Sequence, residues 1–209
     1  MRSDELELAA ATLARRSKPM RRIVAAVGPP TIGRGRPRRT HFAELARAIC
    51  SQQLAGSAAR AIHGRFEALY DGVPTPPAVL ATPEPALRAV GLSGAKVAAI
   101  RDLAARVDDG RVSLARIGAK DDDEVVAQLV QVRGIGRWTA EMFLMFQLGR
   151  PDVWPVDDLG VRKGYGVLHP MAAMPTAREL ESLGEAFRPY RSVAAWYCWR
   201  AAESAPPDL

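Results

Sequence analysis

The chain has 209 residues, enough to bury a core in one domain or in two small lobes. Its formal net charge of +6 favours a polyanionic partner, but the surplus lies in the first 40 residues, so charge alone predicts only a basic N-terminal region. Two cysteines are too few for a four-cysteine iron–sulfur cluster, and no apolar run reaches the roughly 18 residues that a membrane span needs.

Helical patterns follow one another along nearly the whole chain. Helices are predicted over 3–16 and 20–27, and a Gly/Pro/Arg connector follows at 28–40. Capping residues predict further helix starts, at Thr40, at Thr82 before Pro83, at Asp121 with Glu124, and at Thr176 with Glu179. Other helices are predicted over 55–70 and 96–109, and the last ones run to about residue 203. Only 111–117 has an ambiguous strand pattern, so the fold class is predicted to be all-α.

The turn Gly134-Ile135-Gly136 lies between two apolar helical stretches, and Thr139 follows it in the second one. Glycine has no Cβ, so backbone N–H groups in such a turn can approach an anion closely, and the next helix presents its positive end. Alone, this pattern also occurs in ordinary loops. Its two helical flanks favour a hairpin that grips a phosphate.

Two adjacent carboxylates, Asp157 and Asp158, stand at the predicted start of a helix about twenty residues after this turn. Adjacent Asp residues before a helix are usually caps, and one of them is expected to cap here. The two differ by about 100° around a helix, so they cannot serve one pocket equally. A phosphate grip near a carboxylate suggests chemistry on nucleic acid.

These motifs resemble the helix-hairpin-helix/Gly-Pro-Asp DNA glycosylases, in particular the compact form of the 3-methyladenine DNA glycosylase II branch. The resemblance covers roughly residues 35–203. It implies two helical lobes with the active site in the cleft between them. The expected parts are residues 1–39, which pack with the C-terminal lobe; 40–148, the central lobe with the hairpin; and 149–209, the C-terminal lobe.

The resemblance implies a catalytic role for Asp158 and leaves Asp157 as a structural cap or helper near the base pocket. Breaking an N-glycosidic bond builds positive charge on the sugar, which an ionised carboxylate stabilises. Trp138 stands where bifunctional relatives place a nucleophilic lysine, and a tryptophan cannot form a Schiff base. We therefore expect base release by hydrolysis, leaving an abasic site without strand cleavage.

The same resemblance places Trp138 and Trp199 in the base pocket, where electron-rich rings suit bases made cationic by alkylation. The alternative is that both are ordinary core aromatics. A pocket tyrosine of some relatives falls at Met142, which puts the substrate range in doubt.

Further residues are expected at the DNA. Gln53 aligns with the wedge that fills the gap left by a flipped base, beside Gln52, while Leu54 is expected in the core. The alternative for Gln53 is a solvated helix end. Gly94 and Lys96 match a turn that contacts the DNA backbone in the family. Arg137, Arg162 and Lys163 are candidates for phosphate contacts, although most lone arginines are merely solvated.

No cofactor is expected to be required, and the histidines lack the spacing of a zinc site. The resemblance implies a monovalent cation, Na⁺ or K⁺, held at the hairpin by the backbone carbonyls of Val130, Val132 and Ile135. The expected partner is double-stranded DNA with alkylated bases, bound by a monomer, without a membrane. The N-terminus is not typical of a signal peptide, so we expect a cytoplasmic protein associated with a bacterial nucleoid. A glycosylase for another damaged base and a non-catalytic DNA-binding module are the alternatives.

Overall fold

A computed structural model describes residues 1–32 and 39–204, and over these residues the chain is helical without strands, which confirms the predicted all-α class. The chain divides into two compact units, one of Met1–Arg36 with Leu144–Leu209 and one of Pro37–Phe143. Residues 33–38 of the expected connector lie outside the described residues.

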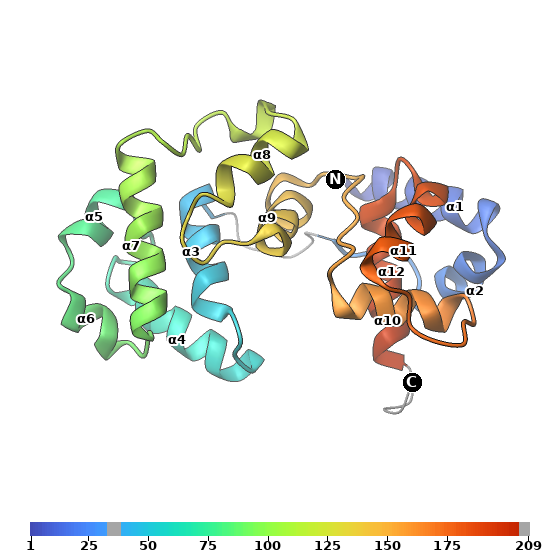
Figure 1. Ribbon diagram of the computed structural model, residues 1–209, viewed down its shortest axis with the longest axis horizontal. Helices are drawn as coiled ribbons and strands as arrows, with labels where there is room; N and C mark the ends of the chain where they lie inside the picture. Colours follow the sequence, from blue (N-terminus) through green and yellow to red (C-terminus); the bar gives the residue numbers. More distant parts are fainter. Residues whose placement is uncertain (33–38, 205–209) are drawn as a thin grey trace. The chain divides into compact units, whose positions relative to one another are not determined.

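The first unit contains the two ends of the described chain (Figure 1). Its helices are α1 (Ser3–Arg16), α2 (Lys18–Val27), α10 (Leu159–Leu168), α11 (Ala177–Leu183) and α12 (Arg191–Ser204), with a π-helical turn at Leu144–Leu148 and a 3₁₀ turn at Gly184–Phe187. Helix α12 packs against α10, α1 and α2. Val193, Ala194 and Tyr197 of α12 are fully buried, and the Tyr197 hydroxyl donates to the Gly28 carbonyl oxygen at 2.9 Å.

In the second unit, α7 packs against several other helices (Figure 1). Its elements are α3 (His41–Ser51), α4 (Gly56–Ala68), α5 (Pro76–Ala81), α6 (Glu84–Ala89), α7 (Gly94–Asp108), a 3₁₀ turn at Ile117–Ala119, α8 (Asp122–Leu129) and α9 (Arg137–Phe143). Leu45 and Ile49 of α3 and Ile100 and Leu103 of α7 are fully buried, so the α3–α7 contact is part of the core.

Most of the predicted helix starts are confirmed. The Thr40 hydroxyl accepts the Ala43 N–H at 3.1 Å, and capping boxes begin α8 at Asp121 and α11 at Thr176. The predicted start at Thr82 is wrong, because Thr82 ends α5 and Pro83 is the N-cap of α6. The Thr82 hydroxyl donates backwards to the Ala78 carbonyl oxygen at 2.8 Å, so it serves the end of one helix and not the start of the next.

Candidate functional site

The carboxylate of Asp158 is fixed at the start of α10. A tight turn precedes it, closed by the Asp158 N–H to the Pro155 carbonyl oxygen at 3.1 Å, and Oδ1 of Asp158 then accepts the N–H of Val161 at 2.8 Å. Asp158 is half-buried, whereas Asp157 is exposed. Asp158 is therefore the helix cap and Asp157 is not, so of the two roles expected for Asp157 the cap is wrong, and the helper near the base pocket stays a prediction. The cap position also puts the Asp158 carboxylate at the positive end of a helix, which favours its negative charge.

Trp199 is the aromatic partner of this carboxylate. Its indole N–H donates to Oδ1 of Asp158 at 2.8 Å, and its ring stacks on Phe146 with centroids 5.8 Å apart and planes inclined by 22°. Phe146 lies in the π-helical turn, a feature that often marks functional sites. The structure thus brings together Asp158 and Trp199, two residues that the sequence proposed separately, and it adds Phe146.

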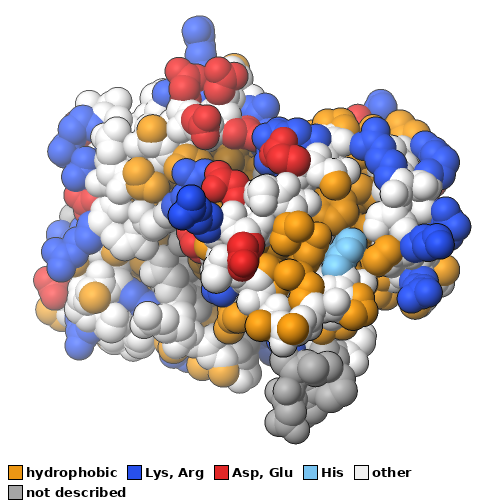
Figure 2. Space-filling model, turned by 45° about the vertical axis from the view of Figure 1, so that its right-hand side comes forward, with side chains coloured by type: hydrophobic (Ala, Val, Ile, Leu, Met, Phe, Trp, Pro, Cys, Tyr) orange, Lys and Arg blue, Asp and Glu red, His pale blue; other side chains and the backbone are white. Residues whose placement is uncertain are grey.

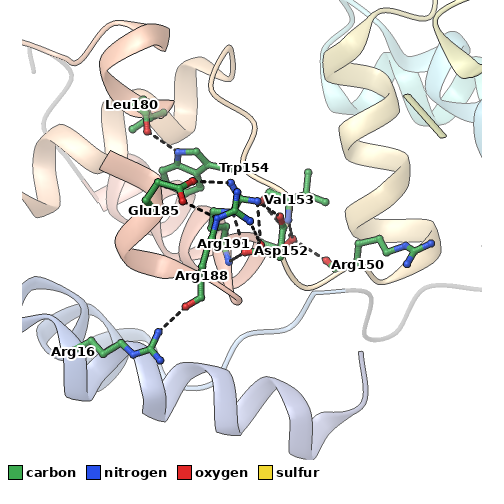
Figure 3. A network of polar contacts seen from close by, with 10 residues as sticks. Arg16, Arg150, Asp152, Val153, Trp154, Leu180, Glu185, Arg188 and Arg191 are labelled. Carbon is green, nitrogen blue, oxygen red and sulfur yellow. Dashed lines mark hydrogen bonds and ion pairs between the residues drawn. The ribbon is translucent and has the colours of Figure 1, made fainter. Parts of the chain in front are cut away.

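The segment that leads to Asp158 is held by a polar network with α11, α12 and the turn before α12 (Figure 3). The Arg191 guanidinium donates to both carboxylate oxygens of Asp152, at 2.9 and 3.0 Å, and Arg188 donates to the same carboxylate at 2.7 Å. The Ser192 hydroxyl accepts the N–H of Val153 at 2.9 Å, and the Trp154 indole N–H donates to the Leu180 carbonyl oxygen at 2.8 Å. Bidentate Arg–carboxylate pairs are geometrically specific, so this network fixes the approach to α10.

The buried thiol of Cys198 lies near the same site and does not act as a nucleophile. Burial raises the pKa of this thiol far above its usual value, and the nearby Asp158 carboxylate raises it further. A thiol must ionise to become a strong nucleophile. Both cysteines are free and buried.

In the other unit, α8 and α9 form the expected hairpin. Val132 and Ile135 fill its interior at 2% and 3% exposure, and the Ile135 N–H donates to the Val132 carbonyl oxygen at 3.0 Å. Gly134 has φ +78°, a conformation that L side chains rarely adopt, and a Cβ there would lie 3.2 Å from the Ala99 side chain. Gly136 has ordinary φ, and nothing lies within 4 Å of a Cβ built on it. The protein's own structure therefore explains glycine at 134 and gives no internal reason for glycine at 136.

Two side chains bond to this hairpin from outside it, and Lys96 bonds to the end of α3 that precedes one of them. The Gln52 amide donates to the Gly134 carbonyl oxygen at 2.8 Å, and Oδ2 of Asp102 accepts the N–H of Arg133 at 2.8 Å. The Lys96 ammonium donates to the carbonyl oxygens of Cys50 and Gln52, at 2.7 and 2.9 Å. Gln52 and Lys96 were proposed as DNA contacts, and the structure gives both an internal role that the sequence did not reveal. The role of Asp102 was missed, and no local sequence pattern signals it.

The chain reverses sharply after α3, at Gln53. This residue is exposed and has φ +55°, so a non-glycine side chain is held in a strained backbone conformation. Leu54, expected in the core, is 37% exposed, and that expectation is wrong. The reason is that α3 ends at Ser51, so the helical periodicity that would have buried Leu54 has stopped.

The first turn of α9 contains the remaining hairpin candidates. Trp138 is 45% exposed, Arg137 pairs with the buried Glu141 at 3.0 Å, and Thr139 is only 5% exposed. The Thr139 hydroxyl lies 3.5 Å from the Gln52 amide, so its side chain packs α9 onto the end of α3. Met142, one turn after Trp138, is half-buried.

Arg162 and Lys163, the other two basic candidates, lie on α10. The Arg162 guanidinium donates to the Pro175 carbonyl oxygen at 2.8 Å, and this bond ties α10 to the loop before α11.

Gly94 is the exposed first residue of α7, after the Ser93 cap. Figure 2 shows Lys and Arg side chains at several places on the visible face, with acidic side chains mainly near its centre and left.

The hairpin carbonyls fit a hard cation in their chemistry. Val130, Val132 and Ile135 offer neutral oxygens, and the Val132 carbonyl, which already accepts one N–H, has a second lone pair. Among residues 1–32 and 39–204, no three His, Cys, Asp or Glu side chains gather as metal ligands. Within the same ranges, no helix has the length and apolar character to cross a membrane.

The fold and the hairpin define a class of DNA repair protein. A model of the HhH-GPD superfamily of base excision DNA repair proteins matches residues 46–189, and the chain belongs to this superfamily. DNA-3-methyladenine glycosylase 1 of Schizosaccharomyces pombe is 35% identical over 188 residues, which are 88% of this chain and 82% of that protein.

Two solved structures are similar to the chain. The Schizosaccharomyces pombe 3-methyladenine DNA glycosylase in complex with abasic DNA matches with a TM-score of 0.85 at 34% identity, over 94% of this chain and 97% of that one. A DNA-3-methyladenine glycosidase from Bacillus halodurans matches with a TM-score of 0.83 at 32% identity, over 94% and 89% of the two chains.

Proposed function

We propose that this protein is a monofunctional DNA glycosylase that releases alkylated purines of the 3-methyladenine type from double-stranded DNA. It hydrolyses the N-glycosidic bond of a flipped nucleotide and leaves an abasic site. The observation that carries the proposal is the Asp158 carboxylate, fixed at a helix start and bonded to Trp199, in a chain of a base excision repair superfamily. The relatives named 3-methyladenine glycosylases support the choice of lesion.

Asp158 is the proposed catalytic group. As the base departs, positive charge develops on the sugar, and a fixed carboxylate interacts more strongly with that transition state than with the neutral substrate. The Val161 and Trp199 donors hold Oδ1 in place, so the carboxylate does not need to reorient during the reaction. This arrangement favours catalysis by electrostatic stabilisation.

Trp138 and Trp199 are the proposed walls of the base pocket. Aromatic faces attract cationic rings, and purines alkylated at a ring nitrogen, such as 3-methyladenine in DNA, have a positive charge that normal bases lack. Met142 replaces a stacking ring of some relatives, so we propose that this wall selects by shape and not by stacking. Gln53 is the proposed wedge in the gap that base flipping leaves.

The hairpin is the proposed grip on the DNA backbone. Gly136 leaves open space in front of its backbone, which is what a close phosphate approach requires. A Na⁺ or K⁺ ion held by the three hairpin carbonyls would add positive charge beside that phosphate. We propose no required cofactor, a monomeric protein, and a place beside the bacterial chromosome in the cytoplasm.

A base-release assay tests the function and separates it from its alternatives. Duplex DNA methylated with dimethyl sulfate should release methylated purines, and duplexes with single defined lesions would reveal a preference for another damaged base. Binding without release of any base would support a non-catalytic DNA-binding protein instead. The abasic product should break only after alkali treatment, and borohydride should trap no covalent complex, because Trp138 cannot form a Schiff base.

A further inference from the structure

Helix α10 presents two glycines to α12, four residues apart and therefore on one face. A Cβ on Gly164 would lie 1.8 Å from the carbonyl oxygen of Cys198, so glycine is needed there for the two backbones to pack. A Cβ on Gly160 would instead meet side chains: Cδ1 of Trp199 at 2.8 Å, Oδ1 of Asp158 at 3.1 Å and Nε1 of Trp199 at 3.2 Å. The two positions therefore serve different purposes.

We infer that Gly160 is a positioning residue for the reaction. Because it has no side chain, the Trp199 indole can lie against α10 and reach the Asp158 carboxylate. The inference rests on the proposed catalytic role of Asp158. It adds a residue whose Cβ position lies against both members of the carboxylate–indole pair and that would not itself contact the substrate.

The groups around the Trp199 indole explain why the absence of a side chain at residue 160 determines where the ring lies. Phe146 stacks on the Trp199 ring, with centroids 5.8 Å apart, and the first turn of α10 lies against its pyrrole edge at Gly160. Separations below 3.0 Å are essentially never adopted by a real Cβ, so a methyl group at 160 must displace the ring. A displaced ring loses the 2.8 Å bond to Asp158 or its stacking on Phe146.

This displacement should leave the fold intact. Gly160 has no left-handed backbone conformation, and Trp199 is half-buried, so its ring has room to move. Alanine is also a better helix former than glycine, which favours α10 in the variant. The expected effect is therefore on the geometry of the reacting groups and not on stability.

The test compares Gly160→Ala with Gly166→Ala. A Cβ at 166 on the same helix finds its nearest atom, Pro175 Cδ, at 3.7 Å, which is ordinary contact, so this variant controls for the added methyl group. The substrate is dimethyl sulfate-methylated duplex, and the readouts are the single-turnover release rate, the affinity for an abasic-site duplex, and thermal unfolding. Gly160→Ala should lower the rate about 10- to 100-fold, as misplaced reacting groups do, with affinity and unfolding close to those of Gly166→Ala.

A double-mutant cycle with Trp199→Ala makes the result specific. Alanine removes both the indole N–H and Cδ1, the ring atom that the added methyl group would meet at 2.8 Å, so the pair is already broken and the collision is gone. Trp199→Ala alone should lower the rate at least as much as Gly160→Ala does, and adding Gly160→Ala should change it little further. If Gly160→Ala alone does not fold, a double variant that folds and keeps the Trp199→Ala rate supports the inference, and one that is slower or unfolded contradicts it.

Two results would overturn the inference. One is a Gly160→Ala rate within twofold of the wild-type rate, and the other is a pair of substitutions whose effects simply multiply. A wild-type protein that releases no base from any substrate would instead contradict the proposed function. The two failures are therefore distinguishable.

Discussion

Trp199 donates its indole N–H to Oδ1 of Asp158 at 2.8 Å, and this bond joins α12 to the start of α10. The terminal torsion of an Asp side chain is normally broad. Here the Val161 N–H reaches the same oxygen, so two donors fix the plane of the carboxylate. A residue that the sequence suggests for base stacking therefore also orients the catalytic candidate.

The first prediction separates the two adjacent carboxylates. Asp158→Asn should lower base release by about 100- to 1,000-fold, because the developing charge on the sugar loses its counter-charge. Asparagine caps helices about as well as aspartate does, so the variant should stay folded and still bind lesion DNA. Single-turnover release and abasic-duplex titrations measure the two effects.

Asp157→Asn is the matched control, since Asp157 is exposed and leaves the cap in place. Its release rate should stay near that of the wild type. An inactive Asp157→Asn beside an active Asp158→Asn would reverse the assignment of the two residues.

Local patterns explain why so much could be predicted from the sequence. The all-α class, the hairpin around Gly134 and the carboxylate at Asp158 each depend on residues close together in the chain. Asp102 and Gly160 were missed because their roles arise only when distant segments meet, at Arg133 and at Trp199. The wrong placement of Leu54 has a local cause, because α3 ends at Ser51 and the strained turn at Gln53 follows, so helical spacing from α3 no longer places Leu54 in the core.

The second prediction uses the strain at Gln53. Glycine adopts positive φ without a steric penalty. The free energy of unfolding of Gln53→Gly should therefore equal that of the wild type or exceed it by up to about 1 kcal/mol. If the side chain is the wedge, the same variant should release bases from duplex DNA more slowly. Urea unfolding and single-turnover release test the two opposite changes.

Gln53→Ala provides the comparison, because it removes the wedge and keeps the strained conformation. Both variants should lose less activity on single-stranded methylated DNA, where no stacked gap needs filling. If Gln53→Gly released bases from lesion-containing duplex DNA at the wild-type rate, Gln53 would be a solvated residue at a helix end and not the wedge.

The third prediction concerns Asp102 and pH. Burial raises the pKa of this carboxyl, but the Arg133 N–H and the Arg106 guanidinium outweigh burial and lower the pKa below its ordinary 3.8. A group with a depressed folded pKa stabilises the protein above its unfolded pKa, and this stability is lost as the pH falls through the folded pKa. Asp102→Asn should therefore be less stable than the wild type at neutral pH, and the difference should shrink below about pH 4.

Urea unfolding at several pH values gives this difference directly. Asp123→Asn, on an exposed position in the first turn of α8, removes the same charge without contacting the Arg133 N–H, so its affinity for DNA should stay unchanged. Asp102→Asn should weaken DNA binding, because the Arg133 N–H loses a charged acceptor. Equal affinities for the two variants would mean that Asp102 does not support the hairpin.

The last prediction uses the difference between the two hairpin glycines. Gly134→Ala forces alanine into φ +78° and against Ala99, so it should destabilise the fold as well as weaken binding. Gly136→Ala meets no protein atom within 4 Å, so its unfolding should match that of the wild type. If a phosphate approaches the backbone at 136, this variant should still bind lesion and undamaged duplexes more weakly, by a similar factor for both, because phosphate contacts hold little sequence information.

Trp138→Ala should instead change the preference among lesions more than the affinity for undamaged DNA. Titrations of all three variants at one fixed salt concentration provide the comparison. A folded Gly136→Ala that binds undamaged duplex as tightly as the wild type would reduce the hairpin to a helix-packing turn.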